Sequence, residues 1–190
     1  MKKGIIGALV GGIIMFVWQF LSFVLIDLHR PSQQYTDKQD EVLSFLATKF
    51  DKDGQYFLPN TPAGASAEEQ EAAMNNAKGK PWAIVSYHKS MDVDMTMNMI
   101  RGLLTDIIMI GLFCFIISKM KDHRFGTILL ASVFTGLIVF CNVPYTNHIW
   151  YEIFDLNAYL IDAVVAWGLV GIWLGYLYSR QEHQHTDAKV

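Results

Sequence analysis

GIIGALVGGIIMFVWQFLSFVLIDL, which runs from Gly4 to Leu28, is apolar almost throughout and carries no charged residue before Asp27. A bilayer core about 30 Å thick is crossed by about 20 apolar residues in an α-helix, so this segment predicts a transmembrane helix over residues 4–28. It is longer than the apolar core of a cleaved signal peptide, which has roughly 7–15 residues, and no small-residue cleavage site follows it. We therefore expect the segment to stay in the protein as its first membrane span.

Three further segments have the same apolar character and lie in the second half of the chain, over residues 98–118, 125–143 and 158–179. Each is long enough to cross a bilayer as a helix whose backbone hydrogen bonds are all internal. Of the 190 residues, 52% are hydrophobic and 17% are charged, against about 25% charged in typical soluble domains. The predicted fold class is an all-α membrane protein, a four-transmembrane-helix bundle, with a small α+β extracytoplasmic domain inserted between the first two spans.

Basic residues indicate which way the chain threads the membrane. They lie before the first span, in the link between the second and third, and after the fourth, as Lys2, Lys3, Lys119, Lys121, Arg124 and Arg180. The aromatic-rich segment 144–157, between the third and fourth spans, has neither lysine nor arginine. Because lysine and arginine mark the cytoplasmic side, we expect both termini and the tail 180–190 in the cytoplasm, and segments 29–97 and 144–157 outside. A bacterial cytoplasmic (inner) membrane is the simplest setting.

The long segment 29–97 carries its own signals of folded structure. Thr36 with Gln39, and Ser66 with Glu69, have the spacing of a helix capping box. The first pair precedes an apolar stripe and the second begins a helix expected to end near Ala77. Short apolar runs over residues 55–58 and 82–87 predict two strands. We expect the order helix, strand, helix, strand, in a unit too small to build a large core alone.

Charged and polar residues within or beside the spans are the first candidates for a functional site, because such residues are costly in a membrane. They are Asp27, Arg101, Asp106, Asn142 and Asp162. Arg101 and Asp106 are five residues apart and fall on different faces of a helix. We therefore expect Arg101 to pair with Asp162 or Asp27. The alternative is that this pair is a structural salt bridge with no further role.

A second group is predicted just outside the membrane, at the outer mouth of the bundle. Its members are His29, His88, Asp92, Asp94, His148 and Glu152. Histidines and carboxylates can bind a divalent metal, and His88 and His148 are the first candidates for ligands. They can also move protons or hold the head group of a substrate. The alternative is that they are ordinary surface residues.

Glycines at four-residue spacing predict close helix packing. Gly7 and Gly11 lie in the first span, and Gly171 and Gly175 lie in the fourth. Small residues at this spacing let two helix backbones approach closely. We expect the first and fourth spans to pack together there within one chain, with packing between two copies as the alternative.

The sequence favours a non-enzymatic role. It contains no H-E-x-x-H, G-x-S-x-G, P-loop or dinucleotide-binding glycine pattern, and no cofactor is predicted. Its net charge of −3 and lack of a basic stripe argue against a nucleic-acid partner. We expect an accessory or assembly subunit in the lipid bilayer, with a protein partner or a second copy of itself. The alternatives are a small oligomeric carrier or channel, and a membrane enzyme or metal-binding protein with its site at the outer mouth.

Overall fold

The computed structural model is mostly helical and consists of two compact units. It describes the backbone of residues 2–187 and the side chains of residues 2–179, so the side chains of the predicted tail, 180–190, lie outside the described residues. The helical unit comprises the residues up to Gln34 and those from Asp94 onward. The loop unit comprises Tyr35–Val93.

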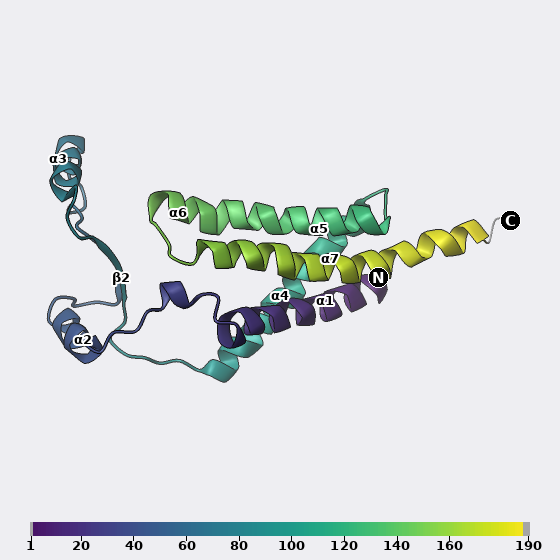
Figure 1. Cartoon of the computed structure of the whole chain (residues 1–190), viewed down its shortest axis with the longest axis horizontal. Helices are drawn as coiled ribbons and strands as arrows, with labels where there is room; N and C mark the ends of the chain where they lie inside the picture. Colours follow the sequence, from purple (N-terminus) through teal and green to yellow (C-terminus); the bar gives the residue numbers. More distant parts are fainter. Residues whose placement is uncertain (1, 188–190) are drawn as a thin grey trace. The chain divides into compact units, whose positions relative to one another are not determined.

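Four long apolar helices make up the helical unit (Figure 1). They are α1 (Lys2–Phe20), α4 (Met95–Lys119), α5 (Phe125–Phe140) and α7 (Leu156–Asp187). A π-helical turn, Leu21–Leu25, extends α1, so the first apolar helical segment ends at Leu25. In the described part of the chain, four segments of 24–26 residues are long and apolar enough to cross a membrane. The prediction of four apolar spans is confirmed, and the fold fits a multi-pass membrane protein.

The third apolar segment is longer than the sequence predicts. A π-helical turn, Cys141–Tyr145, continues α5, and the short helix α6 (Thr146–Trp150) follows it directly. Pro144 lies inside the π-helical turn. A proline lacks the N–H of a regular helix, and a widened turn is one way for a helix to accommodate it. The helical segment therefore runs to Trp150, past the predicted end at residue 143.

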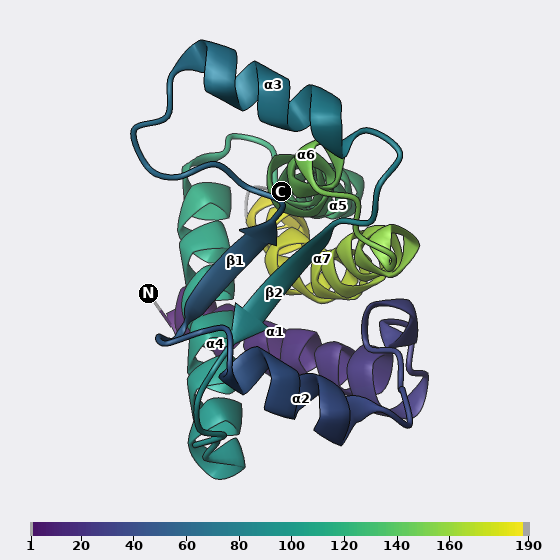
Figure 2. The ribbon, with the colours of Figure 1, turned by 90° about the vertical axis from the view of Figure 1, so that its left-hand side faces the viewer.

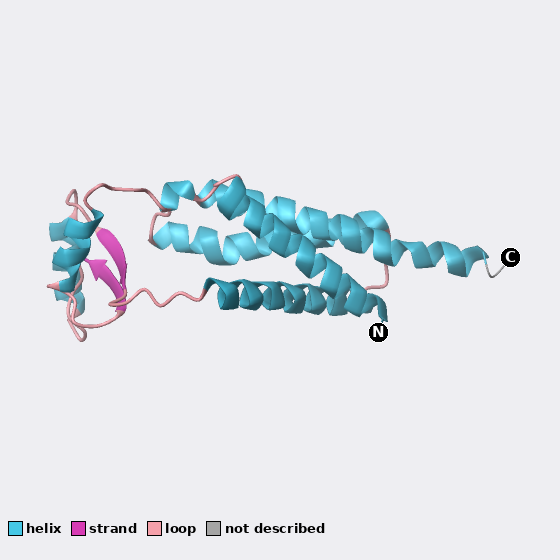
Figure 3. Ribbon diagram, turned by 90° about the horizontal axis from the view of Figure 1, so that it is seen from below, coloured by secondary structure: helices cyan, strands magenta, loops and turns pink. Residues whose placement is uncertain are grey.

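The helices of this unit pack mainly in pairs. The closest pairs are α5 with α7, α1 with α4, and α1 with α7, and Figure 3 shows the helical unit from a second side. A single apolar core connects them, and its most deeply buried members are Ile110, Ile117, Ile128, Val170 and Leu174. The backbones of α5 and α7 approach very closely at Gly136, where an added Cβ would overlap the carbonyl oxygen of Ala163.

The loop unit has the predicted order of elements: α2 (Gln39–Ala47), β1 (Gly54–Leu58), α3 (Ala67–Ala77) and β2 (Ala83–Tyr87). The strands pair antiparallel, with Tyr56 opposite Val85. The two helices lie at opposite ends of this two-stranded sheet (Figure 2).

One of the two predicted capping boxes is confirmed. The Ser66 hydroxyl accepts from the Glu69 N–H, and the Glu69 carboxylate accepts from the Ser66 N–H, which begins α3 as expected. The hydrogen bonds from Ser66 hold the pKa of Glu69 below its ordinary value. The predicted capping box at Thr36 is wrong. The N-cap residue of α2 is Lys38, whose side chain makes no capping hydrogen bond. The Thr36 hydroxyl accepts a hydrogen bond from the Lys38 N–H instead. The chain folds into a local turn there instead.

Aromatic rings form the small core of the loop unit. Phe50 stacks on Tyr56 with 3.9 Å between ring centroids, and its ring also meets that of Tyr87 at 5.4 Å. Of residues 35–93, all of which the structure describes, Tyr87 alone is buried. This unit therefore hides very little of its apolar surface within itself.

Candidate functional site

His29 is the most deeply buried charged or titratable side chain at the end of α1, with 2% of its surface exposed. The chain turns sharply after the π-helical turn because Asp27 adopts a left-handed backbone conformation with φ of 57°. A short 3₁₀-helix, Arg30–Ser32, follows His29. The turn places the imidazole ring in a parallel stack on Phe23, with 3.8 Å between ring centroids. Tyr159 also meets this ring edge-on, with 4.8 Å between ring centroids, so aromatic contacts hold the imidazole in place.

Two carboxylates hold the two nitrogens of this ring. Nδ1 lies 2.8 Å from Oδ2 of Asp155, and Nε2 lies 2.9 Å from Oδ2 of Asp162. Asp155 immediately precedes α7 and Asp162 lies two turns further along it, so both carboxylates lie on one face of the helix. An ionised carboxylate can only accept hydrogen bonds. Each of the two contacts therefore needs a proton, and the three groups share two protons between them.

Trp18 completes the cluster from within α1. Its indole N–H donates to Oδ1 of Asp162 at 2.9 Å, so both oxygens of that carboxylate are engaged. His29, Asp155, Asp162 and Trp18 are called the His29 cluster below. It joins the turn after α1 to the first part of α7 through three hydrogen bonds.

The next residue of α1 makes a separate polar link, to α4. The side-chain amide of Gln19 donates to Oδ1 of Asp106 at 3.1 Å. Asp106 is 3% exposed, and its Oδ2 has no hydrogen-bond partner among the described residues. A buried carboxylate with an unused oxygen is unfavourable, and it is often retained for a ligand, a water molecule or a proton.

A cavity of about 930 Å³ adjoins Trp18, Gln19 and Asp162. Side chains of α1, α4, α5 and α7 line it, and most of them are aromatic or aliphatic or are methionines. Its polar lining comes from Gln19, Asn98, Tyr159 and Asp162, together with the indoles of Trp18 and Trp167. A largely apolar cavity with a few polar groups of this kind is typical of a site for a small amphipathic molecule.

The structure joins only some of the polar residues predicted within the spans. Asp162 meets His29, whereas Asp106 lies apart with Gln19. The expected pairing of Arg101 is wrong, since Arg101 is exposed and forms no ion pair with the described residues.

The structure shows why neither of the two expected partners pairs with Arg101. The oxygens of Asp162 are already taken by His29 and Trp18. Asp27 pairs instead with Arg30, at 3.2 Å on an exposed turn. Asn142, the remaining member of the predicted group, is exposed in the π-helical turn after α5.

The predicted outer-mouth residues mostly have local structural roles. Asp94 caps α4 by accepting from the Met97 N–H, and Nδ1 of His148 accepts from the Ile153 N–H. Glu152 is exposed in the helical unit, and His88 and Asp92 are exposed in the loop unit. Among the described residues, no group of three or more histidines, cysteines or carboxylates is arranged to hold a metal ion.

The four predicted packing glycines all lie at close contacts within the chain, but mainly with other helices than expected. An added Cβ at Gly7 would lie 2.9 Å from Sγ of Cys114, and one at Gly11 would lie 2.7 Å from Ile110, so both face α4. Gly171 and Gly175 face α5, each at 2.8 Å from a side-chain atom. Longer contacts join α1 to α7 as well: an added Cβ at Gly7 would lie 3.1 Å from Leu174 and 3.4 Å from Leu177, and one at Gly11 would lie 3.7 Å from Trp173.

Asp155 is the member of the cluster that the sequence does not single out. It precedes α7 and so belongs to no apolar span. Its spacing of seven residues from Asp162 is the signal that puts both on one helix face. The chain matches no known protein-family model, no curated protein and no solved structure.

Proposed function

We propose that this protein is a non-enzymatic accessory or assembly subunit of a membrane complex. Four spans anchor it, and the loop unit docks on a larger partner protein outside the cytoplasm. The observation that carries this proposal is the composition of the loop unit, whose apolar side chains are mostly left on its surface.

The helix α2 offers the clearest docking face. Val42, Leu43 and Phe45 are exposed over 46%, 58% and 59% of their surfaces. The sheet adds the exposed side chains of Phe57 and Ile84, which lie opposite one another in the strand register. Large apolar side chains exposed together in this way favour an interaction site, because leaving them in water is unfavourable. A partner protein covering these faces would provide the core that the unit lacks.

The His29 cluster supports an anchoring role. His29 lies six residues before Tyr35, the first residue of the loop unit. Asp94, at the other end of the loop unit, caps the first turn of α4. Both connections to the loop unit are thus fastened to the helical unit. These contacts limit the conformational freedom of the chain where it leaves the long helices. They therefore lower the entropy cost of binding a partner.

The proposed orientation has both termini in the cytoplasm. Lys2 and Lys3 begin α1, and Lys119 ends α4, at the end of the helical unit away from His29. Because lysine and arginine gather on the cytoplasmic side, the connections to the loop unit then lie outside. A bacterial inner membrane remains the simplest setting.

Purification from native membranes in a mild detergent tests the role of α2. The parent protein should copurify with a larger protein in fixed stoichiometry, and Leu43→Asp should lose that protein. Ser44→Asp is the matched control, because Ser44 is the next residue of α2, is also exposed and receives the same charge. A parent protein that purifies alone, or as a complex with only its own copies, would contradict the proposal. So would equal losses in the two variants.

A small carrier is the second candidate, and the cavity beside Asp162 favours it. A carrier needs water to reach the cavity from one side of the membrane. Met109 lines the cavity, whereas the neighbouring Ile108 is exposed on the outer surface of α4. In a chain with both native cysteines replaced, a water-soluble thiol reagent should label Met109→Cys and spare Ile108→Cys. If neither position is labelled, the carrier role fails.

A further inference from the structure

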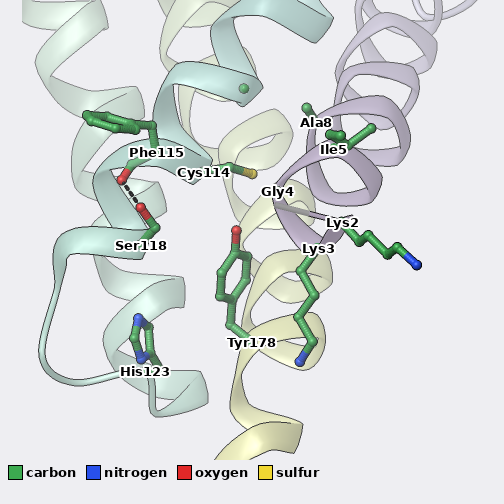
Figure 4. Close-up of a pocket in the computed structure, with 11 residues that line it drawn as sticks. Lys2, Lys3, Gly4, Ile5, Ala8, Cys114, Phe115, Ser118, His123 and Tyr178 are labelled. Atoms are coloured by element: carbon green, nitrogen blue, oxygen red, sulfur yellow. Dashed lines mark hydrogen bonds between the residues drawn. The ribbon is translucent and has the colours of Figure 1, made fainter.

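A second pocket, of about 730 Å³, lies at the end of the helical unit away from the His29 cluster. The first turns of α1, the last turns of α4 and Tyr178 of α7 enclose it (Figure 4). Each of these helices is long and apolar enough to cross a membrane, and the pocket lies where they begin or end. It therefore falls at the depth of the lipid head groups if the helices span a bilayer.

The walls of this pocket are mainly apolar. Ile5 and Ala8 line one side and Phe115 lines the other. The hydroxyl of Tyr178 points toward the thiol of Cys114 (Figure 4). Both of these residues are buried. A slot of this composition suits a hydrocarbon chain better than a polar molecule.

The mouth of the pocket carries positive charge. The two lysines that line the pocket are Lys2 and Lys3. The imidazole of His123 lines it too, with Nε2 3.0 Å from the carbonyl oxygen of Ile117. The first turn of α1 contains no acidic residue. Its free backbone N–H groups and the positive end of the helix dipole therefore add to the field of the two lysines. Nearby, the ammonium group of Lys119 lies 5.3 Å from the ring centroid of Phe115.

Among the side chains that the structure describes, residues 2–179, no carboxylate lines this pocket. Asp122, in the same link as His123, is held by Arg124 through contacts of 2.7–3.1 Å and also accepts from Thr127. The hydrogen bonds from Arg124 keep the pKa of Asp122 well below its usual range, so its charge is matched by that of Arg124.

We propose that this pocket binds an anionic phospholipid, with its phosphate at the end of the pocket lined by Lys2 and Lys3 and one acyl chain along Ile5, Ala8 and Phe115. Basic pockets between membrane helices recognise anionic lipid head groups in this way. A soluble phosphate compound would leave the apolar walls in contact with water, which favours the lipid as the occupant. The proposal does not depend on the partner of the loop unit. It is a separate property of the helical unit.

Lipid binding to the purified full-length protein tests this inference. The protein in neutral detergent is titrated with phosphatidylglycerol or with phosphatidylcholine of the same acyl chains. Bound lipid is counted by native mass spectrometry, and the shift in melting temperature is recorded. We expect one tightly bound phosphatidylglycerol and weaker binding of phosphatidylcholine. Lys3→Gln should weaken the binding of phosphatidylglycerol about fivefold.

Matched variants separate the pocket from general surface charge. Lys121→Gln removes the same charge from the same end of the protein, but Lys121 does not line the pocket. This variant should therefore bind phosphatidylglycerol as tightly as the parent protein does. Lys2→Gln serves as the second pocket variant if Lys3→Gln does not fold. Equal effects of Lys3→Gln and Lys121→Gln would overturn the proposal. So would an equal thermal shift with inorganic phosphate or glycerol 3-phosphate, which would indicate a soluble ligand.

Discussion

Nε2 of His29 lies 2.9 Å from Oδ2 of Asp162, although 133 positions separate the two residues in the chain. The same ring meets Asp155 through Nδ1, so one imidazole fastens the turn after α1 to the beginning of α7. All three side chains lie within or beside segments apolar enough to cross a membrane. Hydrogen bonds between charged groups in such surroundings are strong only when every partner is present.

Replacing His29 with alanine should strongly destabilise the helical unit. The change leaves two carboxylates without their common partner, and removing one side of a buried ion pair typically costs about 3–5 kcal/mol. Thermal or denaturant unfolding of the purified protein in detergent measures the loss.

Arg101→Ala is the control for that experiment. Arg101 is also charged and lies in a candidate span, but it is exposed and makes no ion pair with the described residues. Its loss should change the free energy of unfolding by less than about 0.5 kcal/mol. If Arg101→Ala proves as damaging as His29→Ala, the assignment of the central ion pair to His29 is mistaken.

Gly136→Ala should push α5 and α7 apart. The new methyl group would overlap the Ala163 carbonyl oxygen and the Trp167 ring, and overpacking of this kind costs about 1–3 kcal/mol. Gly168→Ala is the matched control in α7, because no atom lies within 4 Å of the added methyl group there. The melting temperature in detergent should fall for the first variant only. Equal melting temperatures would show that the helices do not meet at Gly136.

The four apolar helices were largely predictable from the sequence because their signal is local. Apolar runs of about 20 residues are read directly from the chain, and the Ser66 and Glu69 capping box likewise depends on residues three positions apart. The extent of the third helix was less predictable. Proline usually ends a helix, and here a π-helical turn accommodates Pro144.

The candidate site was only partly predictable because it depends on tertiary contacts. His29 and Asp162 were both singled out by charge near the spans, but their pairing follows from the left-handed turn at Asp27. Arg101 was expected to pair with Asp162 from its depth in the membrane. Depth alone does not say which face of α4 turns inward, and the structure turns Asp106 inward and Arg101 outward.

Asp106→Asn should keep or raise the stability of the protein. Asn can still accept the hydrogen bond from Gln19 through its carbonyl oxygen, and it removes a buried charge that has no cationic partner among the described residues. Asp106→Ala should lower stability by about 1–3 kcal/mol, because it leaves the Gln19 amide unpaired. Unfolding of the two variants in detergent makes the comparison. An Asn variant as unstable as the Ala variant would show that the charge itself is needed for folding.

Acidification should fray α3. Since the folded-state pKa of Glu69 is lowered, the stability that its carboxylate provides is present above the ordinary glutamate value of about 4.3 and is lost as the pH falls through the folded pKa. Ser66→Ala should raise the Glu69 pKa part of the way toward that ordinary value, because it removes the hydrogen bond from the Ser66 hydroxyl and keeps the one from the backbone N–H. An NMR titration of the Glu69 carboxyl group measures both values. Identical titration curves for parent and variant would contradict the capping box.

The most direct test of the proposed function is site-specific photo-crosslinking from α2 in native membranes. A photoreactive amino acid replaces Leu43 in one protein and, as the control, Ser66 at the start of α3 in another. The account predicts one discrete adduct from position 43 with a protein larger than this chain, and no adduct of that mass from position 66. An adduct only with a second copy of the chain, or crosslinks only within the chain itself, would contradict the claim that α2 docks on a partner protein.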